Sequence, residues 1–232
     1  MEVTVTLSAN AGVAIECGGY RIWVDALHDR KVNGFSTVDP QLQAGLLKSP
    51  AFAHPDFICY THCHPDHFSD ELTRKALKLW PNAKLLLPEQ VFDEQILVSG
   101  EEYTYRSDGI SIRFIRLPHE GEIYADVTHY GILITIGGKQ ILIPGDCETA
   151  YLGLAEALQN VNVDLALLNF PWLGLRKGRA FLEKYMNPAY TIAYHLPFEK
   201  DDRAGYRKAT EKAVGSEGLL LWNPLQEIKL DI

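Results

Sequence analysis

Three histidines and one aspartate lie within six residues of one another, in the segment ICYTHCHPDHFS. In an extended chain His62 and His64 would point to the same side, because side chains alternate with a period of two. Pro65 restricts its own backbone and that of the residue before it, so we expect a turn that presents Asp66 and His67 as a second pair. The chain has only eight histidines in 232 residues, so ordinary surface histidines are a poor explanation for this cluster. The segment therefore predicts two pairs of metal ligands and two metal ions.

The cluster resembles the motif His-x-His-x-Asp-His of the metallo-β-lactamase superfamily, which His62, His64, Asp66 and His67 match at every position. The resemblance covers nearly the whole chain and implies a four-layer αββα sandwich. Hydrophobic periodicity alone indicates only an α/β or α+β protein. The length, with 47% hydrophobic and 22% charged residues, is typical of one globular domain, so we expect a single domain over residues 1–232.

Two further ligands are expected where strand-like segments end. Asp146 follows the segment 139–143 and a Pro-Gly pair, and the glycine would let the backbone turn sharply and bring this carboxylate into the site. His195 follows the β-branched and aromatic segment 190–194. The resemblance implies that Asp146 bridges two metal ions and that His195 is the last histidine ligand.

Two histidines compete for the remaining ligand position. His119 follows the strand-like segment 110–117, whereas His129 precedes the segment 130–136. The sequence lacks the GHTxGS-type motif that marks this ligand in the glyoxalase branch of the superfamily. We favour His119, because the other expected ligands also follow strands. Its spacing to the Gly-Asp pair is similar to that in the branch with ascorbate-phosphate lactonase and N-acyl-phosphatidylethanolamine-hydrolysing phospholipase D.

The resemblance implies a specific division of ligands between two divalent metal ions. One ion would bind His62, His64 and His119, the other Asp66, His67 and His195, with Asp146 between them. Imidazole and carboxylate ligands suit Zn²⁺, Mn²⁺ or Fe²⁺, and Zn²⁺ is our first expectation. A water shared by two such cations would lose a proton near neutral pH and attack an ester, lactone or phosphoester, while Asp66 holds it by a hydrogen bond. We therefore predict a dinuclear metal-dependent hydrolase of a small substrate.

Two other functions remain open. One is a redox enzyme with non-haem iron on the same scaffold, such as a persulfide dioxygenase or a diiron oxygen reductase. The other is a protein that binds metal without catalysis. The metal content of the purified protein would identify the first, and turnover of a substrate panel would separate the second.

Charge narrows the range of partners. The formal net charge is −8, which disfavours a phosphate-rich partner, so no nucleic acid is expected. The densest basic cluster is Arg176, Lys177 and Arg179, in an expected loop before a helix. If this loop borders the metal site, the cluster would bind an anionic group of the substrate; the alternative is a solvated helix start.

We expect a cytoplasmic protein whose cysteines are reduced. No signal peptide, membrane-spanning segment or CxxC pair is present, and the sequence leaves the oligomeric state open. The poorly patterned residues 26–56 are expected to form a flap over the substrate or a peripheral insertion, and residues 89–96 a short helix. The Gly18-Gly19 and Gly137-Gly138 pairs predict β-hairpins, and Ser69 is expected to cap a helix that runs to about Trp80. Asp25 would either cap a turn or support the metal ligands, whereas His28 and His54 are expected to be ordinary histidines.

Overall fold

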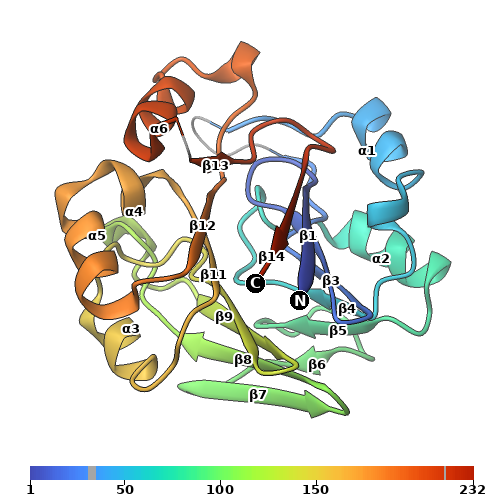
Figure 1. The fold of residues 1–232 in the computed structure, drawn as a ribbon. Helices are drawn as coiled ribbons and strands as arrows, with labels where there is room; N and C mark the ends of the chain where they lie inside the picture. The colour runs from blue at the N-terminus through green and yellow to red at the C-terminus, as the bar shows by residue number, and fades with distance from the viewer. Residues whose placement is uncertain (31–34, 217) are drawn as a thin grey trace.

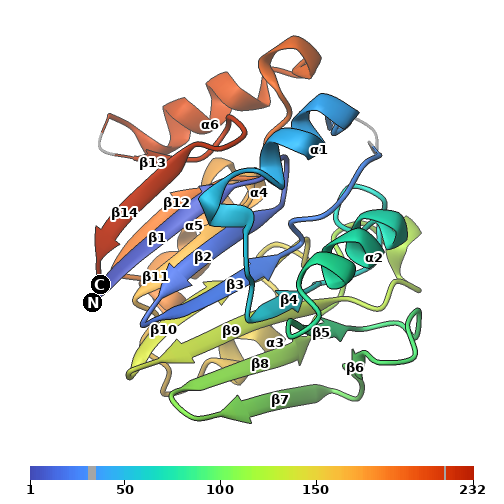
Figure 2. The same ribbon diagram turned by 90° about the vertical axis from the view of Figure 1, so that its right-hand side faces the viewer.

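The computed structural model describes residues 1–30, 35–216 and 218–232. Two seven-stranded sheets pack face to face between outer helices (Figures 1 and 2). The first sheet contains β1 (Glu2–Leu7), β2 (Val13–Cys17), β3 (Tyr20–Val24), β4 (Phe57–Cys59), β5 (Lys84–Leu87), β6 (Ile96–Leu97) and β14 (Glu227–Asp231). The second contains β7 (Glu102–Ser107), β8 (Ile110–Arg116), β9 (Tyr130–Ile136), β10 (Lys139–Ile143), β11 (Leu165–Leu168), β12 (Tyr190–Ala193) and β13 (Leu219–Leu220). The expected αββα sandwich is confirmed.

Helices cover the outer face of each sheet. They are α1 (Pro40–Leu46), α2 (Asp70–Leu79), α3 (Leu152–Ala157), α4 (Phe170–Gly174), α5 (Arg176–Phe181) and α6 (Tyr206–Val214). The described residues also contain three short 3₁₀ helices, η1 (Pro50–Phe52), η2 (Glu122–Tyr124) and η4 (Glu199–Asp201), and one π-helix, η3 (Leu182–Met186). Figure 1 shows α1 and α2 on one side of the molecule and α3, α4 and α5 on the other. Within the described residues, no helix has both the length and the apolar character needed to cross a membrane.

The sheets hold together through alternating apolar side chains. Val3, Val5 and Leu7 of β1 and Ile112 and Phe114 of β8 belong to one fully buried cluster between the two sheets. Separate clusters lie between each sheet and its covering helices. Because side chains on a strand alternate between faces, this pattern determines which face of each strand points to the centre.

Local signals explain several elements. Gly18-Gly19 and Gly137-Gly138 have positive φ angles and close the β2–β3 and β9–β10 hairpins, as the sequence predicts. Helix α2 begins after Ser69, whose side chain accepts a hydrogen bond from the Leu72 amide. The expected helix after the metal motif is therefore confirmed.

Two expectations about loops need correction. Residues 89–96 form no helix: the amides of Val91 and Phe92 donate to the Gln95 side chain, each at 2.8 Å, and this turn leads into β6. The segment 26–56 is more regular than expected, because it contains α1 and η1. Residues 31–34 of the expected flap lie outside the described residues.

The parallel strands determine where the functional loops lie. In the first sheet β3, β4 and β5 run parallel, and in the second β10, β11 and β12 run parallel. Carboxyl ends of parallel strands meet at one edge of a sheet. The loops that follow these strands are therefore brought together at one end of the sandwich.

Candidate metal centre

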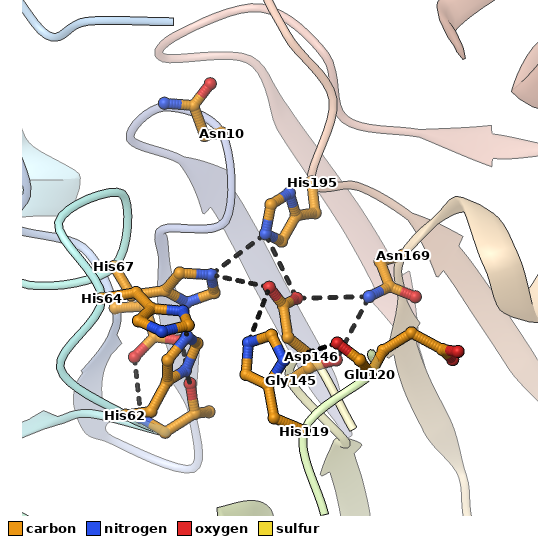
Figure 3. A network of polar contacts seen from close by, with 12 residues as sticks. Asn10, His62, His64, His67, His119, Glu120, Gly145, Asp146, Asn169 and His195 are labelled. Carbon is orange, nitrogen blue, oxygen red and sulfur yellow. Dashed lines mark hydrogen bonds and ion pairs between the residues drawn. The ribbon is translucent and has the colours of Figure 1, made fainter. Parts of the chain in front are cut away.

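The structure brings together all seven side chains that the sequence predicts as metal ligands. Figure 3 shows the five histidines and Asp146 among them. Their potential ligand atoms form three overlapping groups, each with all atoms within 4.8 Å of one another: His62, His64 and His119; His62, His67 and Asp146; Asp66, His67 and His195. These residues follow β4, β8, β10 and β12, so each comes from the carboxyl end of a strand.

The distances between ring nitrogens fit a pair of bound cations. Nε2 of His62 lies 3.0 Å from Nδ1 of His64, and Nε2 of His67 lies 3.0 Å from Nε2 of His195. Two imidazole nitrogens on one tetrahedral zinc ion, each about 2.1 Å from the metal, lie about 3.4 Å apart. His119 adds a buried Nε2 that has no hydrogen-bond partner. The donor set therefore fits divalent metal ions.

Figure 3 shows Asp146 beside His67, His119 and His195. Its Oδ1 is 3.2 Å from Nε2 of His195, and its Oδ2 is 3.3 Å from Nε2 of His67 and 3.8 Å from Nε2 of His119. Oδ2 thus lies near one expected ligand of each ion, His119 of the first and His67 of the second, as a bridging ligand requires.

Asp25 forms hydrogen bonds with His67 and with Thr61, which lies next to His62. The Nδ1–H of His67 donates to Oδ2 of Asp25 at 2.9 Å, and the Thr61 hydroxyl donates to the same oxygen at 2.6 Å. His62 Nδ1 lies 3.0 Å from that hydroxyl and donates to it, which leaves Nε2 of both histidines free to face the centre. Of the two roles considered for Asp25, support of the metal ligands is the one that these contacts favour.

Asp25→Asn is expected to weaken metal binding by about 10- to 100-fold. A neutral amide would no longer polarise His67 directly, nor His62 through the Thr61 hydroxyl. Competition with a chelator would measure the affinity for Zn²⁺. Asp56→Asn is a matched control, since Asp56 binds the Arg21 amide outside the cluster. Equal affinities of the two variants would contradict the proposed role of Asp25.

His119 and His129 differ in how their nitrogens are used. His119 donates from Nδ1 to the Glu120 carbonyl at 2.9 Å, so its Nε2 is left to face the cluster. His129 uses both nitrogens: Nδ1 donates to the Leu117 carbonyl at 3.2 Å, and Nε2 accepts the Asp146 amide at 3.0 Å. The geometry favours His119 as the ligand and gives His129 the role of holding the loop that carries Asp146.

The protonation states of the carboxylates and imidazoles in the cluster favour the binding of cations. Although burial alone would raise the pKa of Asp146, His195 and His67 hold it well below its usual value. Burial lowers the pKa of His62 and His64, which keeps both imidazoles neutral and able to act as ligands. At His67 the carboxylates of Asp146 and Asp25 outweigh burial and raise the pKa well above 6.5. The carboxylates therefore concentrate negative potential where positive charge must be held.

Comparisons with known proteins identify the fold. No protein-family model matches the sequence, and no curated protein sequence matches it. The metallo hydrolase Igni18 from the archaeon Ignicoccus hospitalis KIN4/I is similar in structure, with a TM-score of 0.65, 15% identity and 100% of both chains covered. YhfI from Bacillus subtilis, a metallo-β-lactamase fold protein, has a TM-score of 0.61 and 15% identity, with 98% of this chain and 99% of that chain covered. The chain has the metallo-β-lactamase fold.

The same fold also occurs in a redox enzyme. CmlA, a diiron β-hydroxylase from Streptomyces venezuelae, has a TM-score of 0.63 and 13% identity. The match covers 99% of this chain but only 54% of CmlA. The metallo-β-lactamase fold therefore occurs both in a protein named as a hydrolase and in one named as a hydroxylase.

Gly145 gives the Asp146 loop its shape in this metallo-β-lactamase fold. Its φ is +63°, and a Cβ at this position would lie 2.7 Å from Nε2 of His129 and 3.1 Å from the Thr61 side chain. Gly145→Ala is expected to lower the free energy of unfolding by about 2–4 kcal/mol, through backbone strain and this clash. Gly138→Ala is the control, because φ there is +82° with nothing within 4 Å of the added Cβ. Chemical denaturation of both variants would show whether Gly145→Ala loses more, as the clash requires.

A buried hydrogen-bond network connects the backbone of Asp25 to Ser36, which follows Phe35 in the chain. His28 donates from Nδ1 to the Asp25 carbonyl at 3.0 Å, and its Nε2 lies 3.2 Å from the Asn10 side-chain amide. Asn10 also bonds both the amide and the carbonyl of Ser36, at 3.0 and 2.7 Å. Sequence reasoning treated His28 as an ordinary histidine, and it lies outside the metal cluster, as that view requires. The network nevertheless positions Phe35, the residue before Ser36.

Acid is expected to destabilise the protein through His28. Burial lowers the pKa of its imidazole from 6.5 to about 4, so the unfolded chain binds a proton between these values that the folded chain does not. Stability is therefore unaffected above pH 6.5 and falls as the pH drops from 6.5 towards 4, by up to about 3 kcal/mol for this group. The unfolding free energy of the metal-free protein, measured across this range, should fall more steeply than that of His28→Gln. Parallel pH profiles would contradict the assignment.

A cleft of about 380 Å³ opens beside the metal centre. It is lined by Phe35, His119, Glu120, Tyr124, Asp146, Asn169, Phe170, Pro171, His195, Leu196 and Tyr206. The ring of Tyr124 packs against His119 and His64, with centroids 4.8 and 5.1 Å apart. Three potential ligands thus form part of the cleft wall, and the cleft is where a substrate would reach them.

The basic cluster was expected in a loop, but Arg176, Lys177 and Arg179 lie in the first turns of helix α5 and outside the cleft lining. Arg179 donates to the carbonyls of Leu173 and Gly174 at the end of α4, each at 2.8 Å. Lys177 lies 3.7 Å from the carboxylate of Glu120. The role of Arg176, Lys177 and Arg179 in binding an anionic substrate remains a prediction, and these contacts give two of them other partners.

Sequence reasoning missed Asn169. Its side-chain amide donates to Oδ1 of Asp146 at 3.2 Å and to the Gly145 carbonyl at 3.3 Å, so it orients the central carboxylate. Its position directly after the apolar segment of β11 could have revealed it, because the expected ligands also follow strands. An Asn before a helix is usually explained as a cap, but here the side chain makes no capping bond to α4.

Proposed function

We propose that the protein is a dinuclear metal-dependent hydrolase of a small substrate. The observation that carries this proposal is the position of Asp146, whose Oδ2 lies 3.8 Å from Nε2 of His119 and 3.3 Å from Nε2 of His67, one expected ligand of each ion. One metal ion would be held by His62, His64 and His119, the other by Asp66, His67 and His195, with Asp146 shared. When bound, the ions would supply Lewis acidity and ionise water near neutral pH.

The residues of the chain would then orient the reaction. Asp66 is buried and lies within 4.8 Å of His67 and His195, so its carboxylate can accept a hydrogen bond from the attacking water. Asn169 and His129 hold Asp146 in place through its side chain and its backbone amide. The cleft, with its mostly apolar lining, would present the substrate to the cluster.

Several narrower features belong to the same proposal. Zn²⁺ is the first expectation for both ions, with Mn²⁺ or Fe²⁺ as alternatives. The spacing of His119 supports the branch that contains ascorbate-phosphate lactonase and N-acyl-phosphatidylethanolamine-hydrolysing phospholipase D. The net charge of −8 supports a small-molecule substrate over a nucleic acid. We also expect the protein in the cytoplasm.

Metal analysis combined with a substrate panel would test the proposal. The purified protein, loaded with Zn²⁺ or Mn²⁺, is expected to bind two ions per chain and to hydrolyse members of a panel of aryl esters, lactones and phosphodiesters. Removal of the ions by a chelator should abolish turnover, and their return should restore it. Two bound ions without turnover of any panel member would contradict a hydrolase.

A diiron redox enzyme is the second candidate, because CmlA has the same fold. The same purified protein would then contain iron and consume dioxygen in the presence of a reductant. Zinc in the protein as isolated, with no oxygen consumption after iron loading, would exclude this alternative.

A further inference from the structure

The cleft beside the metal centre has a mostly apolar wall built from separate parts of the chain. Phe35 precedes α1, Phe170 begins α4, Leu196 follows β12 and Tyr206 begins α6. The ring of Phe35 packs on His195 with a centroid separation of 4.3 Å, so the apolar wall reaches the ligands themselves. A substrate group next to the reacting bond would therefore contact these side chains.

The wall is held in position. The centroids of the Phe170 and Tyr206 rings lie 5.9 Å apart. Gly174 leaves room for the Phe170 ring, because a Cβ at position 174 would lie 2.3 Å from it. On the other side, Asn10 bonds the backbone of Ser36 and so fixes the chain beside Phe35. A preformed wall binds a flat apolar group without the cost of ordering its own side chains.

The cleft offers little to an anion beyond the metal ligands. Among the described residues, its lining contains no Lys and no Arg. Its one further charged residue, Glu120, accepts the Thr149 amide at 2.6 Å and lies 3.7 Å from Lys177. Lys177 is therefore already opposite a carboxylate, and a second anionic group would enter an apolar space without a partner.

We infer that the substrate is a carboxylic ester or lactone that carries an uncharged apolar group, aromatic or short-chain, beside the reacting bond. This inference rests on the proposed hydrolase function and names its substrate class. The oxygen of water forms a bond to the carbonyl carbon, the bond from that carbon to the leaving oxygen breaks, and the leaving oxygen takes a proton. The products are a carboxylic acid and an alcohol. The volume of about 380 Å³ is near the lower end for small-molecule sites, which limits the substrate to one or two such groups.

Two esters that differ by one charge would test the inference. Phenyl acetate and 4-acetoxybenzoate would be compared with the Zn²⁺-loaded protein, with rates corrected for their alkaline hydrolysis. We expect kcat/KM for phenyl acetate to be higher by about 10-fold or more, because the second ester must place an unpaired carboxylate against the apolar wall. An equal or higher value for 4-acetoxybenzoate would overturn the inference, most clearly if Arg176→Ala then lowered it selectively.

Variants of Tyr206 connect this preference to the wall. Tyr206 is 39% exposed, so its substitution should not prevent folding. Tyr206→Ala is expected to raise KM for phenyl acetate several-fold, and Tyr206→Arg to shift the preference towards 4-acetoxybenzoate. Tyr185→Ala is the matched control, because Tyr185 is 41% exposed and lies outside the cleft lining. No change in either Tyr206 variant would contradict the role of the wall.

A binding measurement on the metal-free protein separates this inference from the proposed function. Ligand-observed NMR should detect benzyl alcohol at the cleft more strongly than benzoate, and Tyr206→Ala should weaken the signal. Selective binding of benzyl alcohol without turnover of any ester would refute the hydrolase while supporting the apolar ligand class. Absence of binding, or a preference for benzoate, would overturn the ligand class whatever the activity.

Discussion

Asp146→Ala is expected to remove metal from both sites and reduce hydrolysis to background. Its Oδ2 lies 3.8 Å from Nε2 of His119 and 3.3 Å from Nε2 of His67, and its Oδ1 lies 3.2 Å from Nε2 of His195, so the carboxylate contacts expected ligands of both ions. Loss of a bridging carboxylate removes one ligand from each ion and leaves two cations without the negative charge between them. Elemental analysis should show a fall from two ions per chain to less than one.

The control for this prediction is Asp164→Ala, which also removes a partly buried carboxylate. Asp164 accepts the Gln140 amide at 2.8 Å and pairs with Lys139 at 3.0 Å, away from the cluster. This variant is expected to lose stability but to keep two ions. If Asp146→Ala kept two ions, or if the protein held one tight ion unchanged by the substitution, Asp146 would not be a bridge.

His119→Ala is expected to lower the metal content from two ions per chain to about one and to abolish hydrolysis. Its Nε2 is buried without a hydrogen-bond partner, and it faces His62 and His64. A site that loses one of three imidazoles binds Zn²⁺ far more weakly, whereas the second site keeps its own ligands. Elemental analysis and ester hydrolysis would measure the two effects.

His129→Ala should give the opposite pattern. It leaves the Asp146 amide and the Leu117 carbonyl without partners, so we expect a loss of about 2–4 kcal/mol in unfolding free energy with metal content nearly intact. Chemical denaturation would measure the loss. Depletion of metal in His129→Ala together with full occupancy in His119→Ala would assign the ligand to His129.

Local patterns predicted much of the architecture. The Gly-Gly pairs predicted two hairpins because a two-residue turn needs positive φ at both positions, a requirement set by the two residues themselves. The Ser69 cap predicted the start of α2 for a similar reason. The prediction for residues 89–96 was wrong, because Gln95 reaches back to two backbone amides and β6 pairs with β5. Such contacts leave no periodic pattern in the sequence.

The sequence was sufficient to identify side chains that could bind metal, since the cluster from His62 to His67 has its chemistry and spacing within six residues. The other features of the site depend on how distant segments pack. A histidine can bind a metal only if one of its ring nitrogens has no other partner. For His119 and His129, the partners come from the segment that connects β8 to β9 and from the loop that carries Asp146. The cleft wall likewise joins Phe35, Phe170 and Tyr206, which are separated by up to 171 residues in the chain. Only the packing of two sheets brings such distant segments to one edge, because the energy that holds them there comes from the shared core and not from the segments themselves.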